Sequence, residues 1–357
     1  MVTGLMGQRI GTMAELTGAA RTILNCGDDN YAMKQAVERM YAVLAELTGI
    51  SAEDMTTGEI ILPSGKAISP GAAAHCLLEY KRTAIFLRGI RQAIDTVLSR
   101  SASAPVRLLY AGCGPYATLI TPLLSRYSPE ELQVDLLDVN PASLTAAQKV
   151  IETLGLNDFI GDYFCADAAI WQIQDERRYD ILLSETMQAC LDHEPQVAIM
   201  ENLVPQLPEK VFIIPESVVI DAKLTDPKQE MDRLFYSEPP KPPPERIELG
   251  EVLNLNRGRF VKDERTGEVT IPKNLSTCIE LKLFTTVTVF ADEVLSEHDS
   301  SITMPKKFYE FREPYADKVR FWYDCSNMPK ISCAVVASTE TSKNSTDVYY
   351  AAEKITS

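Results

Sequence analysis

The sequence is poor in histidine and has no paired cysteines. Only His75, His193 and His298 occur in 357 residues, and none belongs to a HExxH-like motif. Three isolated histidines argue against a multi-histidine metal centre and against a histidine-dependent catalytic triad. The eight cysteines are dispersed without a CxxC pair, which argues against a zinc ribbon and against a disulfide framework. We expect no metal site, and cysteines that act as small hydrophobic residues in a reducing compartment.

The sequence also lacks long apolar runs and an excess of basic residues. No apolar run approaches the ~18 residues that a membrane span needs, and the first thirty residues show no signal-peptide pattern. Fifty acidic residues against 35 basic ones give a net charge of -15, which disfavours broad nucleic-acid binding. We expect a cytoplasmic protein without nucleic-acid or membrane partners, and a cationic substrate. A homodimer is left open.

The first hundred residues have a helical pattern. Apolar residues recur at helical spacing along one segment, namely Met33, Val37, Met40, Tyr41, Leu44 and Leu47. A second long helix is predicted after Ser69, with Pro70 in its first turn, running toward Arg100. We expect residues 1–100 to form a helical region that covers a cofactor.

From Val106 the pattern changes to short apolar runs that alternate with amphipathic stretches. The predicted strands are 106–110, 134–139, 179–183 and 211–215, and a helix is expected to begin at Pro195. Such runs suit buried parallel strands joined by crossover helices. Residues 101–222 are therefore predicted to form an α/β, doubly wound, Rossmann-like domain.

The last third of the chain has a β-rich pattern. Five prolines between Ser237 and Arg246 predict a linker or extended arm, because proline interrupts helices and central strands. Apolar runs at 252–255, 278–290, 319–323 and 331–336 follow, separated by polar loops. We expect residues 223–357 to form a β-sandwich or barrel-like domain for substrate binding or oligomerisation.

Three polar features of the α/β region favour a ligand that contains adenosine. Gly112 and Gly114 follow the first predicted strand, where glycine lets the backbone approach a ligand. Asp138 closes the next strand, where a carboxylate can accept both hydroxyls of a ribose. Asp167, in the stretch 164–168, is placed after a further strand, the third of the sheet, which precedes the run at 179–183, and there it could meet an adenine amino group. The alternative is that all are ordinary turn residues.

The glycine turn separates two classes of cofactor. A nicotinamide site normally has GxGxxG, but Pro115, Tyr116 and Ala117 follow Gly114. The region resembles class I S-adenosylmethionine-dependent methyltransferases, whose glycine turn holds the methionine moiety and whose next acidic residue holds the ribose. It departs from them at Tyr110, where they carry an acid, and at Tyr116, where they carry the last glycine.

The segment after the fourth strand is the most specific. It resembles the double-glutamate loop of protein arginine methyltransferases, in which Ser-Glu-x-Met is followed by Leu six residues, and Glu nine residues, after the first glutamate. Glu185, Met187, Leu191 and Glu194 match this spacing. The resemblance implies that Glu185 and Glu194 grip a substrate guanidinium, and that Met187 adjoins the substrate. The alternative is a strand-end glutamate and an acidic first turn of a helix.

Physical chemistry independently supports two carboxylates around a guanidinium. The planar guanidinium offers five donors in a fixed fork, which two carboxylates can hold at two edges. Concentrating its positive charge on two nitrogens leaves more electron density on the third, which can then attack a sulfonium methyl. We assign Glu194 the surplus proton.

Two further matches and one departure bear on the substrate. Arg82-Thr83 resembles an Arg-Thr of the arginine methyltransferases, which implies that Arg82 pairs with the cofactor carboxylate and that Tyr80 closes over the cofactor. The Thr-His-Trp triplet of that family's C-terminal domain is missing. Trp322 belongs to the nearest aromatic cluster and could stack on a cation, although a buried strand aromatic is the alternative.

The sequence supports three hypotheses about function. The first is an S-adenosylmethionine-dependent N-methyltransferase acting on a small cationic guanidine or amine such as free arginine. The second is a protein arginine methyltransferase. The third, prompted by Tyr110 and Tyr116, is a regulatory protein that binds S-adenosylmethionine without turnover.

Overall fold

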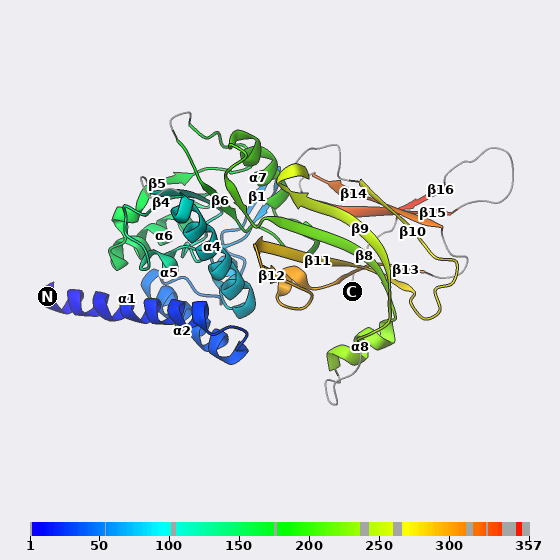
Figure 1. The fold of residues 1–357 in the computed structure, drawn as a ribbon, viewed down its shortest axis with the longest axis horizontal. Coiled ribbons are helices and arrows are strands. Elements are labelled where there is room, and N and C mark those ends of the chain that lie inside the picture. The colour runs from blue at the N-terminus through cyan, green and yellow to red at the C-terminus, as the bar shows by residue number, and fades with distance from the viewer. Residues whose placement is uncertain are drawn as a thin grey trace.

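The protein has an α/β half and a half made of antiparallel sheets, which lie side by side (Figure 1). The structure is a computed structural model. It describes residues 2–53, 55–100, 105–174, 177–235, 243–259, 266–311, 317–325, 328–337 and 348–351.

Two N-terminal helices pack beside the α/β half. They are α1 (Val2–Asn25) and α2 (Asn30–Thr48). The Asp29 side chain accepts hydrogen bonds from the first amides of α2, and Gly49 ends the helix in the left-handed conformation that favours glycine. The predicted apolar face of α2 is buried, with Met33, Val37, Met40 and Leu44 among its members.

The long helix predicted from Pro70 to Arg100 is instead two helices. They are α3 (Pro70–Cys76) and α4 (Tyr80–Arg100). The chain leaves the helix between them, and the buried Leu77 carbonyl accepts a hydrogen bond from Thr83 Oγ1 at 2.8 Å. A short hairpin precedes them, formed by β1 (Ile60–Leu62) and β2 (Gly65–Ala67). The predicted helical region therefore also contains strands.

The α/β half is built on a five-stranded parallel sheet in the order β5-β4-β3-β6-β7. Its strands are β3 (Val106–Ala111), β4 (Leu132–Asp138), β5 (Ile160–Cys165), β6 (Ile181–Ser184) and β7 (Phe212–Ile214). The helices between them are α5 (Thr121–Leu124), α6 (Pro141–Leu154) and α7 (Gln196–Leu203). Strand order reverses at β3, and such a switch point opens a ligand crevice at the carboxyl edge of the sheet.

The other half contains two antiparallel sheets. One has the order β12-β11-β8-β9, with β13 also paired to β11, and the other has the order β10-β14-β15-β16. Their bounds are β8 (Ser217–Thr225), β9 (Arg246–Asn256), β10 (Thr266–Thr270), β11 (Glu280–Phe290), β12 (Glu293–Leu295), β13 (Lys306–Glu310), β14 (Lys318–Asp324), β15 (Lys330–Ala337) and β16 (Val348–Ala351). The predicted fold class is confirmed. Strand β8 spans the boundary predicted at residue 222, and residues 236–242 of the proline-rich segment lie outside the described residues.

Helix α4 joins the two halves. Lys81 Nζ lies 2.7 Å from Asp299 Oδ1, and Glu79 accepts hydrogen bonds from the amide and hydroxyl of Ser301, both at 2.7 Å. Farther along α4, a Cβ on Gly89 would lie 2.6 Å from Val289 Cγ1, so a larger residue there would require α4 or Val289 to shift. The start of α4 is therefore fixed by both halves.

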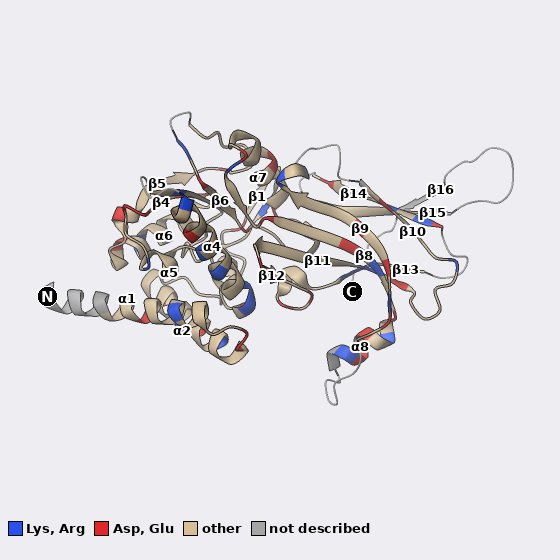
Figure 2. Cartoon of the chain, viewed as in Figure 1, with Lys and Arg blue, Asp and Glu red and all other residues tan. Residues whose placement is uncertain are grey.

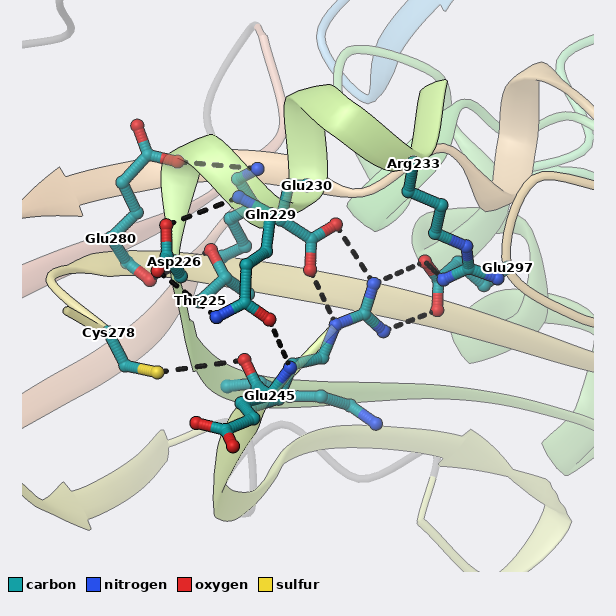
Figure 3. A network of polar contacts seen from close by, with 12 residues as sticks. Thr225, Asp226, Gln229, Glu230, Arg233, Glu245, Cys278, Glu280 and Glu297 are labelled. Atoms are coloured by element: carbon teal, nitrogen blue, oxygen red, sulfur yellow. Dashed lines mark hydrogen bonds and ion pairs between the residues drawn. The ribbon is translucent and has the colours of Figure 1, made fainter. Parts of the chain in front are cut away.

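Helix α8 (Pro227–Phe235) projects from the antiparallel half and is held by ion pairs (Figures 1 and 3). Arg246 donates to both oxygens of Glu230, at 2.6 and 2.9 Å, and to both oxygens of Glu297, at 2.6 and 2.7 Å. Its guanidinium also lies 4.5 Å from the centroid of the Phe284 ring. Figure 2 shows the charged residues spread over both halves. No helix within the described ranges is long and apolar enough to span a bilayer.

We predict that Arg246→Met lowers the free energy of unfolding by about 3 kcal/mol, because it leaves two largely buried carboxylates without their main cation. Lys34→Met is the matched control, since Lys34 pairs with Glu38 at an exposed site. Its expected change is below ~0.5 kcal/mol. Denaturant unfolding measures both, and equal values for the two variants would contradict the role of Arg246.

Candidate active site

A cavity opens at the carboxyl edge of the parallel sheet, where the switch point lies. Its walls come from the β1–β2 hairpin, α3, the start of α4, the turn after β3, the ends of β4 and β5, and the loop between β6 and α7. The polar and glycine residues that line it include Lys66, Arg82, Gly112, Gly114, Asp138, Asp167, Glu185, Thr186 and Glu194.

The turn after β3 requires glycine. Gly112 and Gly114 have φ angles of 75° and 66°, in the left-handed region. A Cβ on Gly112 would lie 2.3 Å from Thr186 Cγ2, so any side chain there would collide with the loop after β6. The turn thus brings bare backbone to the cavity wall.

Asp138 and Asp167 follow neighbouring strands and both line the cavity. Asp138 Oδ2 accepts a hydrogen bond from the Gly114 amide and Oδ1 from the Asn140 amide, both at 2.8 Å. Burial nevertheless raises the pKa of Asp138, against the lowering by these two amides. Further donors from a ligand would stabilise its charged form. Asp167 Oδ1 accepts from the Ala169 amide at 2.9 Å.

The loop between β6 and α7 carries Glu185 and Glu194, and Gln196 ties its ends together. Gln196 is 1% exposed. Its Oε1 accepts hydrogen bonds from the amide and hydroxyl of Thr186, both at 2.9 Å, and its Nε2 donates to the Ser184 carbonyl at 3.1 Å. The two carboxylates are thereby held on one closed loop.

The tip of this loop is held by the antiparallel half. Cys190, Leu191 and His193 have positive φ angles, which are costly without tertiary support. The Tyr323 hydroxyl donates to the Leu191 carbonyl at 2.6 Å, and the Cys190 amide donates to Thr285 Oγ1 at 3.0 Å. Both halves of the molecule therefore shape the loop.

Arg82 connects helix α4 to this loop. Its side chain is nearly buried, and Nη2 donates to Glu185 Oε1 and Oε2 at 2.5 and 2.6 Å. Nη1 donates to Glu79 Oε1 at 3.1 Å. One guanidinium thus lies between the carboxylate of Glu79, just before α4, and a carboxylate of the loop.

Burial dominates the electrostatics of both loop glutamates. It raises the pKa of Glu185 to about 7, an effect that Arg82 opposes and that Glu194 and Glu79 add to. Burial also raises the pKa of Glu194, although a hydrogen bond from Gln188 at 2.9 Å and the charges of Arg82 and Lys66 lower it. Either carboxylate gains stability from a cation brought between them.

The β1–β2 hairpin is part of the site, which the sequence did not indicate. The Lys66 amide donates to the His193 carbonyl at 2.7 Å. A Cβ on Gly65 would lie 2.9 to 3.1 Å from backbone atoms of residues 193–195, so the hairpin touches the loop beside Glu194. Cys76 also lines the cavity, and burial raises the pKa of its thiol to about 11.

Three of the predicted site residues lie outside the cavity lining. Tyr80 is the first residue of α4 and packs partly against the core. Met187 is almost fully buried in the core. Trp322 lies on β14 and is 39% exposed, so it is not the buried strand aromatic that was the alternative. Within the described part of the chain, no three His, Cys, Asp or Glu residues are placed to hold a metal ion.

Comparisons of sequence identify one distant relative. No protein-family model matches the chain. An uncharacterised protein of Methanocaldococcus jannaschii, MJ1452, is 25% identical over 164 residues, which is 45% of this chain. The match covers 56% of that relative's length.

Comparisons of structure show the fold of arginine methyltransferases. The Trypanosoma brucei PRMT1 enzyme–prozyme heterotetrameric complex with AdoHcy matches with a TM-score of 0.51 and 14% identity, covering 79% of this chain and 98% of that one. PRMT6 matches with a TM-score of 0.50 and 13% identity, covering 74% and 98%. The chain therefore shares their fold.

We predict that Gln196→Met lowers the free energy of unfolding by about 3 kcal/mol, because buried hydrogen-bonding groups of Ser184 and Thr186 lose their partner. Gln148→Met is the matched control, since Gln148 is exposed on α6 and bonds only Glu152. We expect its effect to stay within ~0.5 kcal/mol in denaturant unfolding. A Gln196 variant as stable as this control would show that the loop closes without Gln196.

Proposed function

We propose that the chain is an S-adenosylmethionine-dependent N-methyltransferase whose acceptor is a small cationic guanidine or amine, such as free arginine. The observation that carries this proposal is the pair of buried carboxylates on one closed loop. Glu185 and Glu194 line the same cavity as the glycine turn and Asp138.

The residues present fit the cofactor. Asp138 is a buried carboxylate that gains from two hydroxyl donors of a ribose, and the turn at Gly112 leaves room for a ligand against backbone. Arg82 offers a guanidinium at the cavity wall for the cofactor carboxylate. When bound, the cofactor supplies a methyl group on a positively charged sulfur. The fold is also that of a protein solved with AdoHcy.

Four acidic and two basic residues line the cavity, which favours a cationic acceptor. Glu185 and Glu194 would hold two edges of its guanidinium and draw positive charge away from the third nitrogen. That nitrogen would form the new bond to the methyl carbon while the bond from this carbon to the cofactor sulfur breaks and leaves its electron pair on the sulfur. As that bond forms, the nitrogen loses a proton, and Glu194 takes it. Arg82 keeps Glu185 oriented meanwhile.

The hairpin supports a small acceptor. It contacts the backbone on both sides of Glu194 and places Leu62, Lys66 and Ala67 in the cavity wall. The fold likeness supports a protein arginine acceptor equally well, so that remains the main alternative. A regulatory protein without turnover is the alternative of another class.

We predict that Glu194→Gln lowers the turnover of methylated guanidine at least ~100-fold, because a desolvated cation loses one of its two carboxylates. Cofactor affinity should stay unchanged, since no hydrogen bond joins Glu194 to Arg82 or Asp138. Labelled S-adenosylmethionine with free arginine, and separately with an arginine-rich peptide, measures transfer, and calorimetry measures cofactor binding.

Asp138→Ala is the complementary variant and should weaken cofactor binding at least ~10-fold. Wild-type turnover in Glu194→Gln would end the two-carboxylate account. Transfer to the peptide alone would establish the protein-arginine alternative. Cofactor binding without transfer to any cationic acceptor would establish the regulatory one.

We further predict an acidic limb in the pH profile with an apparent pKa near 7. Glu185 must be charged to grip the acceptor, and burial raises its pKa to about 7, so kcat/KM falls as the pH drops through this value. The guanidinium stays charged throughout this range. Arg82 lowers the pKa of Glu185, so Arg82→Met should move the limb to higher pH at saturating cofactor. A kcat/KM that is flat between about pH 6 and 8.5 would contradict this assignment.

A further inference from the structure

One cation that lines the cavity has no ligand group assigned to it by the proposed function. Within the described part of the chain, only Lys66 and Arg82 supply positive charge to the lining. Arg82 is committed to Glu79 and Glu185, and in the proposed function it also meets the cofactor carboxylate. Lys66 is therefore the one lining cation to which the proposed function gives no task.

The backbone at Lys66 is fixed beside the acceptor position. Its amide donates to the carbonyl of His193, the residue before Glu194. Gly65 packs against the same backbone so closely that no side chain fits there. The turn of the hairpin thus holds Lys66 next to one of the two carboxylates that would grip a guanidinium.

The ion pair that Lys66 makes can be exchanged. Lys66 Nζ lies 3.0 Å from Glu59 Oε1, and the two side chains are 23% and 31% exposed. An ion pair of that exposure is worth less than about 1 kcal/mol. Lys66 is among the residues that line the cavity, whereas Glu59 is not, so an anionic ligand group in the cavity could take the place of Glu59 as the partner of the ammonium.

We infer that the acceptor carries an anionic group in addition to its guanidinium or amine, and that Lys66 binds this group. This inference rests on the proposed function and narrows its substrate class. Glu185 and Glu194 hold the cationic end, and Lys66 holds a carboxylate at the other end. A free amino acid such as arginine fits this charge pattern, whereas an arginine inside a peptide has amide groups in place of the carboxylate.

The test compares arginine with agmatine, which keeps the guanidinium and lacks the carboxylate. With S-adenosylmethionine saturating, kcat/KM of the full-length protein is measured for both acceptors. We expect the wild type to prefer arginine at least ~10-fold, the size of one well-placed charged contact. Lys66→Met should reduce the arginine-to-agmatine ratio to near one.

Two controls separate charge from structure. Lys66→Arg keeps the cation and should retain most of the preference. Lys34→Met makes the same chemical change on the exposed face of α2 and should leave the wild-type ratio unchanged. Far-ultraviolet circular dichroism and calorimetric cofactor affinity check that each variant is folded and loaded.

The outcomes are distinguishable. A wild type that methylates both acceptors equally, or a Lys66→Met variant that keeps the wild-type ratio, overturns the inference and leaves the proposed function intact. A wild type that binds cofactor but methylates neither arginine, agmatine nor an arginine peptide overturns the proposed function, and the inference with it. If Lys66→Met loses the preference for arginine over agmatine while Lys66→Arg and Lys34→Met keep it, both the inference and the proposed function are supported.

Discussion

The buried guanidinium of Arg82 is the charge on which the site depends. Its partners come from two segments, Glu79 from the turn just before α4 and Glu185 from the loop after β6. An unpaired charge at this depth would cost several kcal/mol, so α4 and the loop must keep their relative positions. Glu79 also accepts two hydrogen bonds from Ser301, which extends the constraint to the antiparallel half. Helix α4, the loop after β6 and the antiparallel half thus meet at one ion cluster.

This cluster also sets the charge available to a ligand. Arg82 offsets one carboxylate of the Glu185 and Glu194 pair, and burial raises the pKa of both. Buried carboxylates that lack a full set of partners favour a bound cation. The positive charge of the cation stabilises their charged form, which burial disfavours. Arg82 has a double task under the proposed function, since it would meet the cofactor carboxylate while it keeps Glu185 in place.

The sequence predicted the ranges of four of the five parallel strands, all but β5, together with the α2 face and the two-glutamate loop, because each depends on residues close together along the chain. The hairpin was missed because three-residue strands give no periodic signal, and because its main contact joins Lys66 to His193, which is far away in sequence. The break after Cys76 was missed for a similar reason. Glu79 is not helical and accepts a hydrogen bond from Ser301, which is far away in sequence. No residue near Glu79 in the sequence indicates that contact. Gln196 follows Pro195 in a sequence that indicates only a helix start, although its side chain closes the loop.

The two tyrosines that depart from the usual glycine motif need not mean a loss of cofactor binding. Tyr116 is fully buried, and its hydroxyl donates to the Ile50 carbonyl at 2.6 Å, just beyond the end of α2. A ring there fills core volume beneath the turn, whereas Gly112 and Gly114 keep the backbone at the cavity bare. Tyr110 lines the cavity as a neutral phenol, and burial raises the pKa of this phenol further above its ordinary value. Tyrosine in place of the usual acid at position 110 lowers the negative charge near Asp138 and Glu185. Both of these carboxylates have a ligand group assigned to them in the proposed function.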